Sequence, residues 1–412
     1  MTKVTIGKIT DSCLGKMLDK EKNKGIPKPY LANINVRWGD FDTDSLSYMR
    51  FEENENERYG IKDGDLIVCE GGEPGRCAIW DGRIADMKIQ KALHRVRAKS
   101  GYDIRYIYYW MLLAGKNNAL EKYFTGSTIK HLPGDRLKEI ELEIPNYKEQ
   151  VAVADLLSCL DLKIQTNAIL NDNLAQMLRL LYEQWFYRFE FPNEQNLPYN
   201  RANGELEWND KLKRRIPKGW KVQTMLSNEL FSVISSGIDR FSTKKYYATA
   251  DIIGTSIGEG NDIEYETRES RANMQPVINS IWFAKMKNSI KHLFLNKEMS
   301  SFVDNSILST GFYGLKCNEI SFEYIASVVS APIFEITKDR LSHGATQQGI
   351  GDDDMSNITL LIPDDTTLRK YHEATNGFFA KISNNILENK RLIAIRNFLL
   401  PLLMNGQANI AE

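Results

Sequence analysis

The segments "KIQTNAILNDNL" (163–174) and "KISNNILENKRL" (381–392) decide the fold, because they place the same polar pair in two distant helix-like stretches. The pair is Asn167 and Asn171 in the first segment, and Asn385 and Asn389 in the second. Both pairs interrupt an otherwise apolar pattern with helical spacing. The offset of 218 residues between them suggests that one unit occurs twice in the chain.

The self-similarity extends beyond these helices. At the same offset, segment 89–181 aligns with 307–399 without a gap, and 16 of its 93 positions are identical. This is roughly 17%, where ordinary composition gives about 6% by chance. The match includes "IELEIP" (140–145) and "ITLLIP" (358–363). We therefore interpret the chain as two tandem copies of one unit.

Each copy begins with a part that is predicted to contain both strands and helices, and it ends with a long helical part. Short apolar runs bounded by glycine and proline predict strands at 65–69, 94–98 and 280–284. Helical spacing predicts helices at 104–113 and 322–329, and we assign the aromatic run 106–110 to the core rather than to base stacking. Each mixed part is expected to be an α+β domain that closes with a strand before Pro145 or Pro363.

A long helix follows each mixed part. Asn146 and Glu149 form a capping-box pattern at the start of the first helix. Spacings of three and four define an apolar seam, as in a coiled coil. The first seam comprises Leu157, Leu160, Ile164, Asn167, Asn171, Leu174, Leu178 and Leu181, and the second Phe378, Ile382, Asn385, Asn389, Leu392 and Leu399. Because neither stripe is stable exposed to water, we expect the two helices to pair as an antiparallel coiled coil.

These patterns predict five segments. They are a mixed domain (1–145), a helix (146–190), a linker (191–215), a second mixed domain (216–363) and a second helix (364–405). The asparagines are interpreted as a register lock in the seam, the alternative being solvent exposure where the helices separate.

Composition narrows the function. The 412 residues are 42% hydrophobic and 26% charged, with no long apolar run or secretion-like N-terminus, which predicts a soluble cytoplasmic protein. The five scattered cysteines are expected to be free thiols. A net charge of −1 excludes a uniformly basic nucleic-acid binder, yet segments 83–99 and 285–297 are locally basic. Two such patches fit a protein that touches a polyanion at two places.

Catalytic motifs are absent from the sequence. It has no phosphate-binding G-x-x-x-x-G-K-[ST] loop, no H-E-x-x-H and no G-x-S-x-G, and its five histidines lack metal-ligand spacing. The tetrapeptide "NLPY" (196–199) departs from the N-P-P-Y signature of amino-methyltransferases at its second residue and lies in the linker. We therefore expect a chain that is not an enzyme and holds no metal.

Three stretches carry a resemblance to a known family. They are "GDLIVCEGGEPGRCAIWDG" (64–82), "FTGSTIKHLPGDRLKEIELEIPNYKEQ" (124–150) and "IPKGWKV" (216–222). Their order and the duplication resemble the DNA-specificity subunit of type I restriction–modification systems. The second copy departs from the pattern, with "GATQQGIGDDDM" (344–355) in place of "GSTIKHLPGDRL" (126–137).

The resemblance implies two target-recognition domains, each reading one half of a bipartite, asymmetric site in double-stranded DNA. It implies that the paired spacer helices dock two modification subunits. S-adenosylmethionine is then expected in those partners, and ATP with Mg in a restriction and translocation subunit, with no cofactor in this chain. The alternatives are a stand-alone DNA methyltransferase or nuclease, and a duplicated scaffold that binds only proteins.

Polar and basic residues of the mixed domains are the candidates for DNA contact, because phosphates attract lysine and arginine and glutamine can read adenine. The candidates are Lys16, Arg37, Lys88, Lys91, Lys130, Arg240, Lys285, Lys287, Lys291, Gln347 and Gln348. For each lysine the alternative is a solvated surface, and for the glutamines it is a polar loop. Thr128 and Thr346 are assigned to turns rather than to DNA contact.

Overall fold

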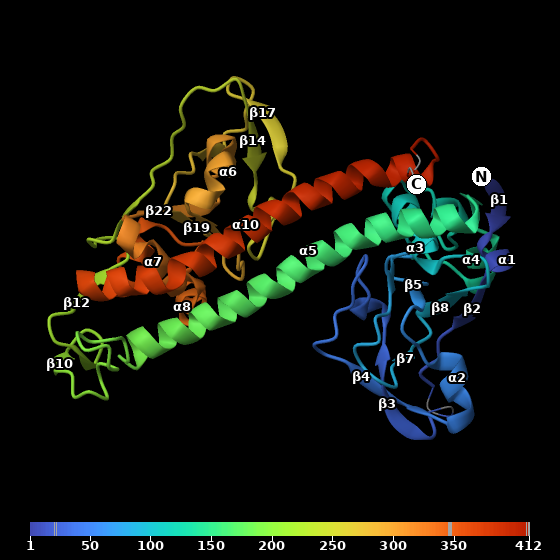
Figure 1. The fold of residues 1–412 in the computed structure, drawn as a ribbon, viewed down its shortest axis with the longest axis horizontal. Helices are drawn as coiled ribbons and strands as arrows, with labels where there is room; N and C mark the ends of the chain where they lie inside the picture. Colours follow the sequence, from blue (N-terminus) through green and yellow to red (C-terminus); the bar gives the residue numbers. More distant parts are fainter. Residues whose placement is uncertain (20, 22, 345–347, 409, 411–412) are drawn as a thin grey trace. The chain divides into compact units, whose positions relative to one another are not determined.

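The computed structural model describes residues 1–412 except 20, 22, 345–347, 409 and 411–412 (Figure 1). The chain forms two compact units, one of residues 1–162 with 393–412 and the other of residues 163–392. Each unit contains strands, short helices and a part of both long helices. The fold is therefore α+β, and each unit is described by itself.

The first unit is built on a four-stranded sheet of order β2-β8-β5-β6. A three-stranded sheet, β4-β3-β7, and the pair β1-β9 complete its strands. The strands are β1 (Thr2–Thr5), β2 (Thr10–Leu14), β3 (Ile26–Leu31), β4 (Ser47–Phe51), β5 (Leu66–Cys69), β6 (Cys77–Ile79), β7 (Lys88–Ile89), β8 (Leu93–Ala98) and β9 (Glu141–Ile144). The short helices are α1 (Ile6–Ile9), α2 (Asn56–Tyr59), α3 (Ile104–Lys116) and α4 (Gly134–Glu139).

The second unit contains two four-stranded sheets, of order β13-β22-β19-β20 and β17-β14-β21-β18. The pairs β12-β23, β10-β11 and β15-β16 are separate. The strands are β10 (Leu206–Asn209), β11 (Arg214–Pro217), β12 (Lys221–Thr224), β13 (Phe231–Val233), β14 (Thr243–Tyr247), β15 (Ile252–Ile253), β16 (Ser256–Ile257), β17 (Asn261–Glu264), β18 (Ala272–Met274), β19 (Ser280–Ala284), β20 (His292–Leu295), β21 (Ser306–Ser309), β22 (Phe312–Cys317) and β23 (Thr359–Ile362). The short helices are α6 (Ser300–Asp304), α7 (Phe322–Ser330), α8 (Pro332–Leu341) and α9 (Asp352–Met355).

The repeated sequence adopts a repeated topology. The order β2-β8-β5-β6 corresponds strand by strand to β13-β22-β19-β20. Each unit also has a parallel pair, β3 with β7 and β14 with β21, beside an antiparallel neighbour. The predicted strands at 65–69, 94–98 and 280–284 are confirmed as β5, β8 and β19, and the predicted helices as α3 and α7. Tyr106 and Tyr109 are buried, which confirms the core role of the aromatic run.

The two long helices are α5 (Tyr147–Tyr182) and α10 (Asp365–Met404) (Figure 1). A π-helical turn, Glu183–Tyr187, extends α5. The two helices begin alike: the Asn146 side chain accepts a hydrogen bond from the Glu149 amide at 3.1 Å, and Asp364 accepts one from the Thr367 amide at 2.9 Å. These caps are 218 residues apart and satisfy amides that a helix start leaves without partners.

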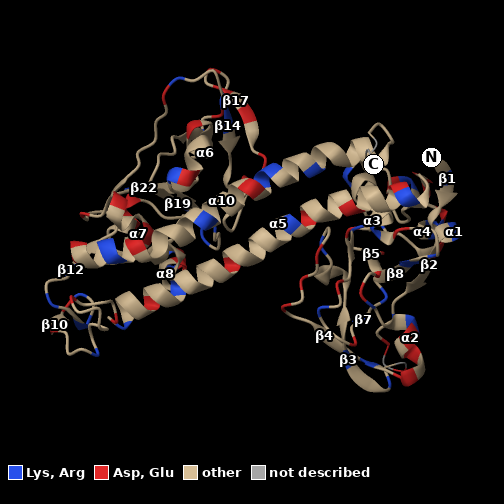
Figure 2. Cartoon of the chain, viewed as in Figure 1, with Lys and Arg blue, Asp and Glu red and all other residues tan. Residues whose placement is uncertain are grey.

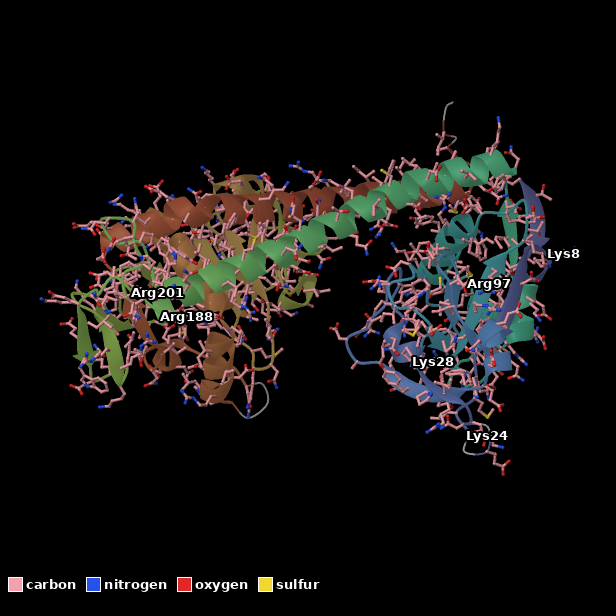
Figure 3. All side chains as sticks on the ribbon, turned by 60° about the horizontal axis from the view of Figure 1, so that its bottom comes forward. Lys8, Lys24, Lys28, Arg97, Arg188 and Arg201 are labelled. Carbon is pink, nitrogen blue, oxygen red and sulfur yellow. The ribbon has the colours of Figure 1, made fainter. Side chains whose placement is uncertain are left out.

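The segment predicted as a linker is more ordered than its composition indicated. It contains the β10-β11 hairpin, and Phe191 stacks on Tyr199 and Trp220 at centroid distances of 4.6 and 5.0 Å. Arg201 of this segment pairs with Glu190 at 3.0 Å and is labelled in Figure 3. Leu206–Asn209 and Arg214–Pro217 mix polar and apolar residues, so no apolar run marked these strands in the sequence and the hairpin escaped prediction.

Over the described part of the chain, no single helix has the length and apolar character needed to cross a membrane. One pair, 319–330 with 332–341 bent by 67°, meets the length and composition criteria jointly.

Candidate nucleic-acid interface and helix seam

Four asparagines join the long helices within the second unit. Asn167 Nδ2 donates to Asn389 Oδ1 at 2.9 Å and to Glu388 Oε2 at 2.7 Å. Asn385 Nδ2 donates to Asn171 Oδ1 at 2.8 Å, and Asn389 Nδ2 to the Ile164 carbonyl at 3.0 Å. The contacts advance along α5 as they recede along α10, so the two segments run antiparallel. Asn167 and Asn385 are 2% and 1% exposed, so the solvent-exposed alternative does not apply to them.

The same antiparallel relation occurs inside the first unit. Arg396 of α10 pairs with Asp161 of α5 at 2.7 Å, and Asp161 also accepts a hydrogen bond from the Tyr109 hydroxyl at 2.7 Å. Leu157 of α5 and Leu400 of α10 belong to one apolar cluster with α3. The start of α5 and the end of α10 therefore pack on the core of the first unit.

The exposure of side chains along the two long helices follows the predicted spacing of three and four residues. Every predicted seam residue is buried or half-buried: Leu157, Leu160, Ile164, Asn167, Asn171, Leu174, Leu178, Leu181, Phe378, Ile382, Asn385, Asn389, Leu392 and Leu399. Other apolar side chains of α5 face outward, including Leu162 at 64%, Ile169 at 54% and Leu180 at 59% exposed. Lysine, arginine and acidic residues are interspersed along the helices (Figure 2).

Two of the lysines nominated for DNA contact are buried, and for them the prediction is wrong. Lys16 is 2% exposed, and its ammonium group is bonded to the Arg50 carbonyl at 2.9 Å and to Glu55 at 2.5 Å. Lys88 is 4% exposed in β7, and burial lowers the pKa of its ammonium group. Their positive charge predicted exposed side chains, whereas both side chains are buried beside the strands.

The other three candidates of the first unit are exposed. Lys91 follows β7, Arg37 pairs with Asp42 at 3.1 Å, and Lys130 pairs with Glu121 at 2.9 Å. Lys28 of β3 was not selected from the sequence. It pairs with Asp86 at 2.7 Å and is labelled in Figure 3. Several cations of this unit are thus partly neutralised by neighbouring carboxylates, which weakens their attraction for phosphate.

Four candidates of the second unit, Lys285, Lys287, Lys291 and Gln348, lie in or against the β19-β20 connection. Lys287 Nζ donates to Gln348 Oε1 at 2.9 Å, so these two predicted residues are brought together. Lys291 donates to the Thr249 carbonyl, and burial lowers the pKa of half-buried Lys285, which lies 5.7 Å from the Tyr313 ring centroid. Arg240 is exposed and lies 5.8 Å from the Tyr265 ring centroid. Gln347, like Thr346, lies outside the described residues.

A buried polar triad beneath this connection was missed from the sequence. Lys338 of α8 is fully buried and pairs with Glu335 at 2.5 Å, and Glu335 bonds His292 at 2.9 Å. Burial alone would raise the pKa of Glu335, but hydrogen bonds from His292 and Lys338 hold it below its ordinary value. Glu335 and Lys338 lie three residues apart on α8, whereas His292 of β20 is 43 residues from Glu335, so only the fold brings the histidine to this pair.

Among the described residues, no group of three or more histidine, cysteine, aspartate or glutamate side chains could hold a metal ion.

Comparison with known proteins gives a consistent result. Residues 1–176 match the sequence model described as "Type I restriction modification DNA specificity domain". The chain is 27% identical over 344 residues to the MjaIX specificity subunit of Methanocaldococcus jannaschii, covering 79% of this chain and 74% of that one. It is 20% identical over 415 residues to the HindI specificity subunit of Haemophilus influenzae, covering 84% and 87%. The crystal structure of a type I restriction–modification S subunit from M. genitalium aligns with a TM-score of 0.57 at 17% identity, over 98% of this chain and 95% of that one.

Proposed function

We propose, from the similarity of this chain to type I restriction–modification DNA-specificity subunits, that it is the non-catalytic subunit that selects the DNA sequence. The observation that supports this most directly is the repeated sheet, β2-β8-β5-β6 and β13-β22-β19-β20, each followed along the chain by one long helix. Two similar but unequal domains suit a bipartite, asymmetric site. Each target-recognition domain reads one half of that site in double-stranded DNA.

The long helices serve as the spacer in this proposal. The asparagine pairs in the second unit and the Asp161–Arg396 pair in the first support an antiparallel coiled coil along α5 and α10. A rigid spacer of this kind fixes the distance between the two DNA-reading domains. The preferred site therefore has two specific segments separated by a spacer of constant length and any sequence.

The outward faces of the helices are the proposed docking surfaces for two modification subunits. Exposed apolar side chains such as Ile169, Leu180 and Phe398 would be covered there, because large apolar groups left in water usually mark a partner surface. S-adenosylmethionine belongs to the modification subunits, and ATP with Mg to a restriction subunit where one joins the complex. The complex acts in the cytoplasm, where the host DNA lies.

The test has two arms. Sequencing of methylated bases in the host, with and without this gene, should reveal one bipartite motif that disappears when the gene is deleted. The purified chain alone should bind no S-adenosylmethionine in equilibrium dialysis, whereas its complex with modification subunits should. Detectable binding by the chain alone, or a methylome indifferent to the gene, would reject the proposal in favour of a stand-alone methyltransferase or a protein scaffold.

A further inference from the structure

Two loops occupy the same place in the two repeated sheets. The first loop, "EGGEPGR" (70–76), connects β5 to β6, and the second loop, "KMKNSIK" (285–291), connects β19 to β20. Both are anchored alike: the Leu132 amide donates to the Glu70 carbonyl at 2.7 Å, and the Ile350 amide to the Lys285 carbonyl at 3.1 Å. Because the backbone setting is shared, differences between the loops reflect their side chains.

The loops differ in charge. In the first loop, Glu73 pairs with Arg76 at 2.8 Å and accepts a hydrogen bond from the Trp38 indole at 2.7 Å. The second loop has three lysines and no acidic residue, and none of these lysines forms an ion pair with a carboxylate in the part of the chain that the structure describes. The second loop thus carries a concentration of positive charge, which would attract a polyanion such as the DNA backbone.

The loops also differ in exposed apolar surface. Met286 and Ile290 of the second loop are 45% and 63% exposed, where the first loop has Gly71 and Gly75. Ile253 of the neighbouring β15-β16 hairpin is 77% exposed, and the next residue, Gly254, bridges to Lys291. Exposed apolar side chains set among lysines fit a partner that offers both anionic and apolar groups.

The second loop is held in place from below. Lys338 donates to the carbonyls of Ala284 and Ser289 at 3.3 and 2.9 Å, and the Asn288 amide donates to Asp339 at 3.0 Å. Lys338 is fully buried, so these bonds are shielded from water. A loop fixed before binding loses little conformational entropy when it meets its partner.

We propose that the second loop enters the major groove and that Ile290 and Met286 contact thymine methyl groups, while the loop lysines contact flanking phosphates. The inference rests on the proposed DNA-reading function. The major-groove edges of base pairs carry donors, acceptors and one apolar group, the C5-methyl of thymine, which is the group that isoleucine and methionine can recognise. The half-site read by the second domain therefore contains thymine where the loop lies.

The test uses the full chain assembled with its modification subunits and duplexes carrying the motif defined by the methylome. Ile290→Gln and Met286→Gln should each weaken binding by roughly 5- to 30-fold without changing the slope of log affinity against log salt. Lys287→Gln should instead lower that slope by about one. Ile333→Gln is the matched control, since Ile333 is an isoleucine of the same unit, 53% exposed on α8, and should leave affinity and slope unchanged.

Deoxyuridine, which lacks the methyl group, provides the second arm. Replacing thymines of the second half-site one at a time should weaken binding by the wild-type complex at one or more positions and leave binding by Ile290→Gln unaffected there. The inference is overturned if both loop variants bind DNA with wild-type affinity, or if no uracil substitution weakens binding by the wild-type complex. The proposed function still stands in that case, provided that the wild-type complex binds DNA specifically. Loss of subunit assembly in Ile290→Gln also overturns it, because the apolar side chains would then contact a protein. Absence of specific DNA binding by the wild-type complex instead rejects the proposed function.

Discussion

Leu120 in the first copy and Lys338 in the second stand 218 residues apart, and both lie beneath the loop that joins the third and fourth strands of their sheet. Leu120 contacts the first loop at Gly75: a Cβ placed on that glycine would lie 2.6 Å from a Leu120 methyl group. Lys338 donates to the Ser289 carbonyl in the second loop and to the Ala284 carbonyl at the end of β19, and it pairs with Glu335 on its own helix. The same position of the sequence repeat, a turn in the first copy and α8 in the second, thus holds one loop by apolar contact and the other by buried polar bonds.

The difference teaches how a duplicated fold can acquire two surfaces. A loop with glycines at its turns can settle directly on a leucine, whereas a loop with three lysines repels itself and requires directed bonds to stay in one conformation. Buried ion pairs add little net stability when compared with good apolar packing, so they are better explained by the specific geometry that they impose.

The largest expected effect comes from breaking the polar support. Lys338→Met leaves Glu335 buried with one partner fewer, and should lower the free energy of unfolding by about 3–5 kcal/mol in urea titrations. Leu120→Met is the matched change in the first copy and should cost less than about 1.5 kcal/mol, because it conserves apolar volume. Equal losses in the two variants would mean that the triad is no more than ordinary packing.

The features that could be predicted from the sequence are those that depend on regular spacing of residues. The seam positions from Leu157 to Leu181 could be read from steps of three and four, because a helix repeats its contacts every turn. Burial of Lys16 and Lys88 could not be read, since it depends on Glu55 and on the pairing of β3 with β7. The Lys338 triad was equally invisible, because His292 of β20 meets Glu335 and Lys338 only after α8 packs against that strand.

A smaller effect is expected from the polar centre of the seam, which differs from its apolar ends. Replacing Asn167, Asn171, Asn385 and Asn389 together by leucine should raise stability by about 1–4 kcal/mol, as for other buried polar groups replaced by apolar ones. A complex assembled with this variant should methylate sites with a wider range of spacer lengths, because apolar side chains permit alternative registers. Thermal unfolding and methylome sequencing measure the two effects.

Asn173→Leu is the control for that experiment, since Asn173 lies on the exposed face of α5. It should change neither stability nor spacer choice. A quadruple variant that is more stable but keeps a single spacer length would show that the asparagines do not set the register.

The smallest expected effect concerns the attachment of α10 to the second sheet domain. Lys390 lies 4.4 Å from the Tyr247 ring centroid and 5.5 Å from that of Phe302, where the first copy has exposed Asp172 at the equivalent position. Burial, aided by Lys245 and opposed by Glu259, lowers the pKa of Lys390 to about 8 from 10.5. Between these two values the unfolded chain binds more protons than the folded chain, so stability rises with pH.

The melting temperature should therefore increase modestly from pH 8 toward pH 10 relative to Lys390→Met, which removes the titrating group while keeping apolar contact with both rings. Lys381→Met, on an exposed face of the same helix, should retain the wild-type pH dependence. Burial raises the pKa of Tyr247 to about 12, so the hydroxyl stays protonated through the window. A pH profile unchanged in Lys390→Met would show that the ammonium group stays charged against the rings, and that α10 holds the second sheet domain by a cation–π contact instead.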